Sequence, residues 1–155
     1  MRLLPTTAFA IAALLSPLPL LAQDDAAETA LEARQGFMEM LGINMGVLAG
    51  MAKGDTPYDE AAAATAGANI EALSRYALPG LFLEGTSTDD LPDDTAALPA
   101  VWKDNATFTT RFADFTNAAA GAGEAVKGGQ EAVGPVVQKL GATCKACHDT
   151  FRKPE

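Results

Sequence analysis

The chain has 155 residues, a net charge of −9, 48% hydrophobic residues and only 6% aromatic residues, which suits one folded domain rather than a disordered chain. An acidic protein is repelled by phosphate backbones, so we do not expect nucleic-acid binding. There is one His, which excludes metal sites that need two imidazoles and leaves little material for a conventional hydrolase triad.

The first 22 residues have the pattern of a secretory signal peptide. Arg2 supplies a positive charge, an apolar run extends from Ala8 to Leu21, and the chain turns polar after Ala22. This run is interrupted by prolines and is shorter than the ~20 residues that cross a bilayer, so a membrane anchor is the weaker interpretation. We predict cleavage near Ala22, export to the periplasm, and one mature domain of residues 23–155 with no membrane span.

Apolar residues then recur at intervals of three and four, the period of a helix face. A first helix is predicted over residues 26–53. The line of residues that follows this spacing along one side of the helix, which we call its seam, consists of Leu31, Arg34, Met38, Leu41, Met45 and Leu48. A second helix, rich in Ala, is predicted from about residue 58 to 76. Residues 78–99 carry five Pro and Gly residues and are predicted to form a long loop.

Asp104 has the residue type of an N-cap, so a third helix is predicted to begin there and to end near the glycines of residues 121–129. A fourth helix is predicted from Gln130 to Arg152. No segment of the mature chain shows the alternation of a strand. The sequence therefore predicts an all-α fold, an antiparallel four-helix bundle, with room for a prosthetic group between the helices.

Both cysteines and the one histidine lie in the pentapeptide Cys144-Lys145-Ala146-Cys147-His148. Cys-x-x-Cys-His is the attachment signal of haem c. Two thiols one helical turn apart can each add to one of the two haem vinyl groups, and His148 can bring a ring nitrogen to the iron. We predict one covalently attached haem c per chain, bound through two thioethers.

Other interpretations of the two cysteines are weaker. A zinc site needs more ligands than this sequence offers. A thioredoxin-like redox pair is expected next to a βαβ unit, and none is visible. A disulfide at this spacing inside a helix would be strained.

Three further segments, together with residues 144–148, give the chain its resemblance to a known family. Residues 34–38 resemble the family's first-helix motif, residues 51–59 its first turn, and residues 99–102 with Phe108 the start of its third helix. The chain resembles the class II c-type cytochromes, the cytochrome c′ family with its low-spin c-556 relatives. The resemblance covers the mature chain and implies a haem site near the C-terminal end of a four-helix bundle.

The resemblance also implies roles for residues around the haem. Met38 falls at the distal position, where it either binds the iron or stays unbound. Arg34 is expected to bind the haem propionates with help from Gln35, with a surface ion pair as the alternative for Arg34. Arg152 is expected near the proximal side, with a helix-end cation as its alternative.

Two functions remain open at this stage. In the first, His148 and Met38 both bind iron and the protein carries one electron, which is not an enzymatic role. In the second, only His148 binds, and NO or CO enters at a hindered distal face. A peroxidase is the weakest hypothesis because no distal His remains to move protons. We expect basic redox partner proteins because the chain is acidic, and the family resemblance allows a homodimer through the first two helices.

Overall fold

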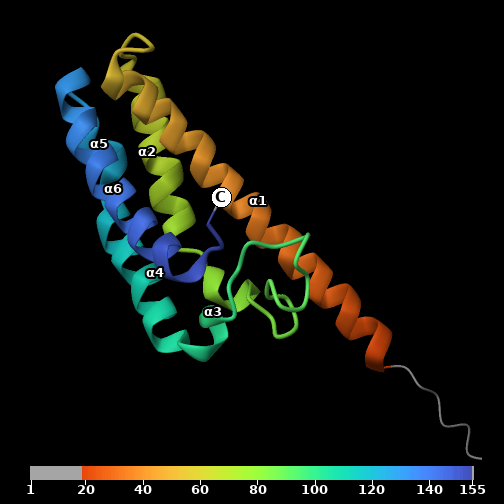
Figure 1. Ribbon diagram of the computed structural model, residues 1–155. Helices are drawn as coiled ribbons and strands as arrows, with labels where there is room; N and C mark the ends of the chain where they lie inside the picture. Colours follow the sequence, from red (N-terminus) through yellow and green to blue (C-terminus); the bar gives the residue numbers. More distant parts are fainter. Residues whose placement is uncertain (1–18, 155) are drawn as a thin grey trace, which may run out of the picture.

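The computed structural model describes residues 19–154, with side chains from Asp25 onward, and these residues are almost entirely helical (Figure 1). Four long helices form the bundle: α1 (Pro19–Lys53), α2 (Glu60–Ser74), α4 (Asn105–Ala119) and α6 (Gln130–Phe151). Three pieces of four residues each connect them: η1 (Leu78–Leu81), α3 (Ala100–Lys103) and α5 (Ala122–Ala125). Both α1 and α4 pack against α2 and α6, so the four long helices enclose one core and the predicted bundle is confirmed.

Two of the long helices begin at capped positions. The side chain of Asp59 accepts a hydrogen bond from the Ala62 amide at 2.9 Å, and Asp104 accepts one from the Thr107 amide at 3.4 Å. Each cap satisfies a backbone N–H that the first turn of a helix leaves without a partner. The N-cap predicted at Asp104 is therefore confirmed.

The first helix is longer than predicted. It begins at Pro19 instead of about Ala26, because residues 23–33 consist mostly of good helix formers and proline is well tolerated in a first turn. Residues 1–18, which make up most of the predicted signal peptide, lie outside the described residues. The cleavage near Ala22 and the domain boundary at residue 23 stay predictions.

The core lies between the long helices, on the apolar faces that the three-and-four spacing indicates. Leu48, on the predicted seam of the first helix, is fully buried and packs together with the fully buried Ile70, Val133 and Leu140. Phe37 was not on the predicted seam of the first helix, yet it is only 3% exposed and its ring lies against those of Tyr76 and Phe112. Helix α1 therefore buries a wider stripe than a strict seam.

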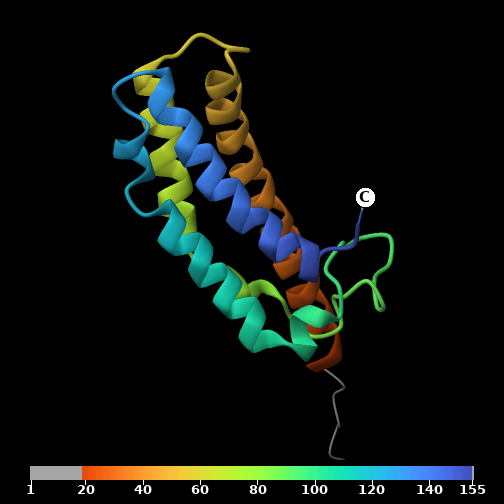
Figure 2. The same cartoon turned by 60° about the vertical axis from the view of Figure 1, so that its left-hand side comes forward.

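Residues 82–99, which we call the strap, join η1 to α3. Figure 2 shows the strap beside the first half of α1 and the C-terminal end of α6. Its backbone is bonded to the end of α6, since the Leu98 amide donates to Phe151 O at 2.9 Å and the Lys153 amide donates to Ala96 O at 2.8 Å. The predicted loop over residues 78–99 thus includes η1 and is an ordered cover over one end of the bundle.

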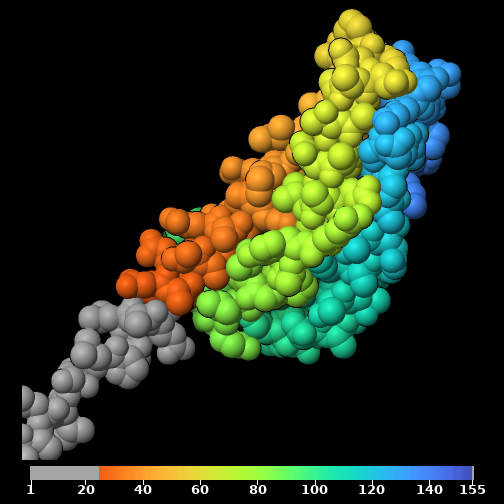
Figure 3. Space-filling view, turned by 180° about the vertical axis from the view of Figure 1, so that it is seen from behind, coloured from red at the N-terminus to blue at the C-terminus, as the bar shows by residue number. Residues whose placement is uncertain are grey.

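Helices α1 and α2 lie side by side on the face seen in Figure 3. This face carries exposed apolar side chains, with Ile43 at 68% exposure and Tyr76 at 52%. Between residues 19 and 154, no helix has both the length and the apolar character that crossing a bilayer requires.

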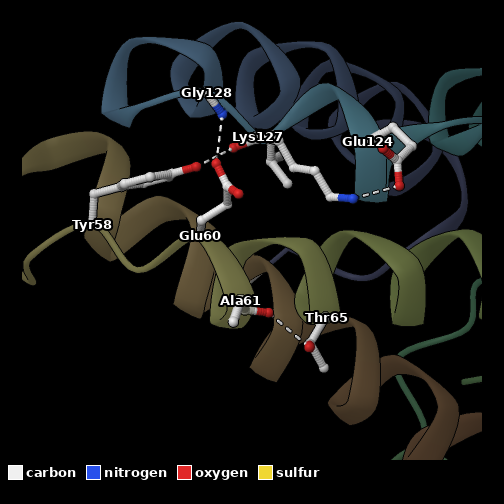
Figure 4. A network of polar contacts seen from close by, with 8 residues as sticks. Tyr58, Glu60, Ala61, Thr65, Glu124, Lys127 and Gly128 are labelled. Carbon is white, nitrogen blue, oxygen red and sulfur yellow. Dashed lines mark hydrogen bonds and ion pairs between the residues drawn. The ribbon is translucent and has the colours of Figure 1, made fainter.

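Polar contacts tie the start of α2 to the connection between α5 and α6, at the end of the bundle opposite the strap (Figure 4). The Tyr58 hydroxyl donates to Val126 O at 3.0 Å, and the Gly128 amide donates to a carboxylate oxygen of Glu60 at 3.1 Å. These bonds satisfy backbone groups at a chain reversal, which keeps α5 against α2.

Helices α2 and α5 approach each other closely at Gly67. A Cβ built on Gly67 would lie 2.7 Å from the carbonyl oxygen of Ala122 and 2.8 Å from the Cα of Gly123. Such distances are shorter than van der Waals contact, and the neighbouring atoms belong to backbone that cannot rotate away. Gly67 is therefore needed for the approach of the two helices.

We expect Gly67→Ala to destabilise the protein by about 1–3 kcal/mol, because overpacking outweighs the gain in helix propensity. The matched control is Gly46→Ala in α1, where a new Cβ has no neighbour within 4 Å. That control should stabilise the protein by about 0.5–1 kcal/mol. Urea unfolding followed by circular dichroism measures both changes. Equal effects of the two substitutions would contradict the close approach at Gly67.

Candidate functional site

A pocket of ≈ 210 Å³ lies under the strap, at the C-terminal end of α6. Its walls come from α1, the strap, α3, α4, α6 and the residue after α6, so segments far apart in the sequence meet there. The lining residues are Arg34, Gln35, Met38, Phe82, Thr95, Ala96, Ala97, Val101, Phe108, Cys147, His148, Phe151 and Arg152.

Helix α6 brings the pentapeptide to this pocket. Cys147 and His148 line it, whereas Cys144, one turn earlier, is half-buried but does not line it. Both cysteines are free thiols. Their spacing of three residues places both on one side of α6, so Cys144 lies just outside the pocket that Cys147 helps to form.

Burial favours the protonated form of both thiols. It raises the pKa of Cys144, and it raises the pKa of Cys147, where repulsion from Cys144 adds to the effect and the cation of Arg111 opposes it. Neither thiol therefore has the lowered pKa of a catalytic nucleophile. Within the described part of the chain, no group of three or more His, Cys, Asp or Glu side chains could hold a metal ion.

Aromatic rings build the apolar wall of the pocket. Phe108 contacts Phe82 and Phe151 edge to face, with ring centroids 4.7 and 5.3 Å apart. Trp102 supports Phe82 from behind, and its indole N–H donates to Phe82 O at 3.0 Å. Sequence reasoning missed Phe82 and Phe151 as lining residues. The position of Phe151, one turn beyond Cys147 on the same seam, could have signalled its role.

Met38 lines the pocket from α1. It has 38% of its surface exposed, whereas Leu31, Arg34 and Leu48 on the same seam are at most 7% exposed. Met38 is thus a seam residue whose thioether borders open space instead of core atoms. The structure brings Met38 and His148 to one pocket from two different helices.

Arg34 is buried to 4% exposure and is held by the strap rather than by a carboxylate. Its guanidinium donates to Thr86 Oγ1 and Thr86 O, both at 2.7 Å, to Thr95 Oγ1 at 2.9 Å, and to Leu81 O at 3.4 Å. It also lies 4.6 Å from the centroid of the Phe82 ring. The alternative of a surface ion pair for Arg34 is therefore wrong. Burial lowers the pKa of this guanidinium, since the charged form is costly away from water.

The two remaining predicted residues also reach the pocket. Gln35 is exposed, and its side-chain amide donates to Asp94 O in the strap at 2.6 Å. Arg152 follows the end of α6 and pairs with Ala97 in an isolated β-bridge. Both line the pocket, and both also help to fasten the strap.

The donor set of this pocket fits a haem c. Two free thiols and one imidazole lie near the end of α6, the Met38 thioether of α1 lines the same pocket as Cys147 and His148, and three Phe rings add apolar surface that suits a porphyrin. Arg34 supplies a buried cation with no ion-pair partner among the described residues, which suits a cofactor that carries carboxylates.

Comparisons with known proteins agree with this chemistry. Residues 29–152 match the family model of Cytochrome C'. The chain is 39% identical to a cytochrome c′ of Cereibacter sphaeroides over 92% of this chain and 95% of that protein. It is 35% identical to a cytochrome c-556 of Agrobacterium tumefaciens over 78% of this chain and 94% of that protein. The solved structure of "Cytochrome c' from Rhodobacter Spheriodes" superposes with a TM-score of 0.78 at 40% identity, over 83% of this chain and 98% of that chain.

The family match spans most of the chain, and the relatives are covered almost completely. Fold, pocket and sequence similarity thus lead to the same class of haem protein. The chain belongs to the cytochrome c′ family of class II c-type cytochromes, whose members carry a covalently attached haem c.

Proposed function

We propose that this cytochrome is a one-electron carrier in which His148 and Met38 would both bind the haem iron. One observation carries the proposal: an imidazole from the end of α6 and a thioether from α1 line the same pocket. Haem c supplies the redox chemistry when bound, as its iron changes between the ferric and ferrous states. A His/Met pair is a common ligand set of electron-transfer haems, and it raises their reduction potential.

The protein residues have distinct roles in this proposal. Cys144 and Cys147 would each hold the haem through one thioether, and His148 would bind its iron. Phe82, Phe108 and Phe151 exclude water from the haem faces and lower the local dielectric constant.

Arg34, Gln35 and Arg152 are proposed to border the haem at the strap, where the propionates would lie. All three line the pocket, and two are arginines. Arg34 contributes its positive charge from a buried position. Gln35 and Arg152 would bind and orient the cofactor, Arg34 would act through its charge, and none of the three would react with the haem.

The cellular setting follows from the first residues and from the charge. The apolar run before Ala22 favours export to the periplasm, where the cytochrome would exchange electrons with other proteins. The net charge is −9, and the four aspartates of the strap, Asp89, Asp90, Asp93 and Asp94, are exposed. Charge complementarity therefore favours basic redox partners.

Visible absorption of the purified protein, oxidised and reduced, with and without CO, tests the proposal. We expect a sharp reduced α band, a weak thioether-to-iron band in the oxidised form, and no response to CO, because both axial positions are filled. A broad high-spin spectrum that shifts on addition of CO would contradict ligation by Met38. It would favour a five-coordinate protein that binds NO or CO.

The homodimer that the resemblance implies has a candidate face on α1 and α2. A groove there is lined mostly by apolar side chains, among them Phe37, Met40, Ile43 and Tyr76. Met40 is 47% exposed and Ile43 is 68% exposed. An exposed apolar surface that continues over two helices is typical of an interaction site. We propose that a second copy of this chain packs on this face (Figure 3).

We expect Ile43→Lys to shift the protein from dimer to monomer, because a charge would be buried at the centre of the contact. Sedimentation velocity at several concentrations measures the change, and the dissociation constant should rise at least ~10-fold, or about 1.4 kcal/mol. The control is Ala61→Lys, an exposed position of α2 outside the groove, which adds the same charge. A wild-type protein that stays monomeric at high concentration would contradict the proposed dimer.

A further inference from the structure

The buried cation of Arg34 is fixed in place by the strap. Its two terminal guanidinium nitrogens carry four N–H groups, and the four hydrogen bonds to Leu81, Thr86 and Thr95 use them. The Phe82 ring covers the guanidinium at 4.6 Å. All of these acceptors are neutral, so the positive charge is held in position without being cancelled.

The two threonine hydroxyls are themselves held in place. Thr86 is 1% exposed, and its Oγ1 donates onward to Leu83 O at 2.7 Å while it accepts from Arg34. The Oγ1 of Thr95 accepts from Arg34 and from the Ala97 amide at 3.1 Å. Each hydroxyl is thus an oriented acceptor, so the guanidinium has little freedom to rotate or withdraw.

This geometry differs from the one the resemblance implied. A bidentate clamp on a propionate needs two free N–H groups on one side of the guanidinium. Here the terminal N–H groups are already used by the strap and by Leu81 of η1, while Arg34 and Thr95 line the pocket together with Met38 and His148. Arg34 therefore acts on the pocket through its charge.

We propose that Thr86 and Thr95 are positioning residues that hold the Arg34 cation at the wall of the haem pocket, where its charge favours the reduced haem. The inference rests on the proposed function, since it needs a haem in this pocket. Reduction adds one negative charge to the haem. A fixed cation nearby stabilises that state, and it does so more strongly in a water-poor site than in water.

The test is a spectroelectrochemical titration of the haem-containing protein with Thr86→Val and Thr95→Val combined. Valine keeps the branched shape and removes the acceptor. The ratio of reduced to oxidised haem at the wild-type midpoint should fall about three- to tenfold, and tenfold corresponds to 59 mV for one electron. Thr86→Ser with Thr95→Ser should restore the wild-type potential. Thr65→Val, whose hydroxyl bonds only within α2 at the far end of the bundle (Figure 4), should leave it unchanged.

Combining the valine substitutions with Arg34→Gln shows whether the threonines act by positioning Arg34 or by supporting the fold in general. Arg34→Gln should lower the potential by itself, and adding the two valines to it should produce no further shift, because they act through Arg34. If the combined valine variant does not fold, Thr95→Val alone, at a half-buried position, gives the same comparison.

Two results would overturn the inference: an unchanged potential in the valine variant, or a shift that persists in the Arg34→Gln background. Both are distinct from a failure of the proposed function. That failure would show first as a wild-type protein without covalently bound haem.

Discussion

Replacing both Cys144 and Cys147 by Ser is expected to abolish covalent haem attachment. In the proposed site each thiol would supply one of the two thioethers, and a hydroxyl would not replace it. Any haem that remains would be held only through His148 and would separate under denaturing conditions. Haem staining of the protein on a denaturing gel should fall to background, and the thermal midpoint should fall because the native state loses a bound group.

The control for this prediction is Lys145→Ala, between the two cysteines. Lys145 is exposed and forms only a surface ion pair with Asp149, with N···O at 2.6 Å, which contributes little to stability. Haem staining of the control should equal that of the wild type. Staining that survives in the double serine variant would contradict the assignment of the thioethers to these two residues.

Replacing Met38 by Leu is expected to convert the haem from six-coordinate to five-coordinate. Leucine has a similar volume but no sulfur, so the distal position opens while the helix is preserved. The spectrum should become high-spin and respond to CO. The potential should fall, so that the ratio of reduced to oxidised haem at the wild-type midpoint drops more than ~10-fold, since the thioether ligand is what raises it.

Met40→Leu is the matched control for Met38→Leu. Met40 lies on the same helix, is 47% exposed and does not line the pocket. It should leave the spectrum and the potential as they are. If Met38→Leu also leaves the spectrum and the potential unchanged, Met38 is not an iron ligand. That result would contradict the electron-carrier proposal and favour a haem protein that binds NO or CO.

The four long helices could be predicted because their apolar residues repeat with the period of a helix. Ile70 and Leu140 are fully buried on the faces that this period identifies. The short pieces η1, α3 and α5 could not be predicted, because four residues are too few to show a period. The early start of α1 was missed because residues 19–22 were assigned to the predicted signal peptide, so the first helix was placed after them.

The chemistry of the site was predictable where it depends on local spacing. Cys147 and His148 share one helix end, so their sequence positions determine their approach. The hydrogen bonds from Arg34 to the strap could not be predicted, because Thr86 and Thr95 lie 52 and 61 residues away from it in the chain. Such contacts depend on how the strap folds across the end of the bundle, which no local pattern reports.

The most direct measurement for the central claim is the intact mass of the protein after export and denaturation. We predict a chain that begins at about Gln23 and is heavier than the polypeptide by the mass of one haem. This result would establish covalent attachment and the processing of the first residues together. A mass equal to that of the polypeptide alone, with both thiols free to react with an alkylating reagent, would contradict the account.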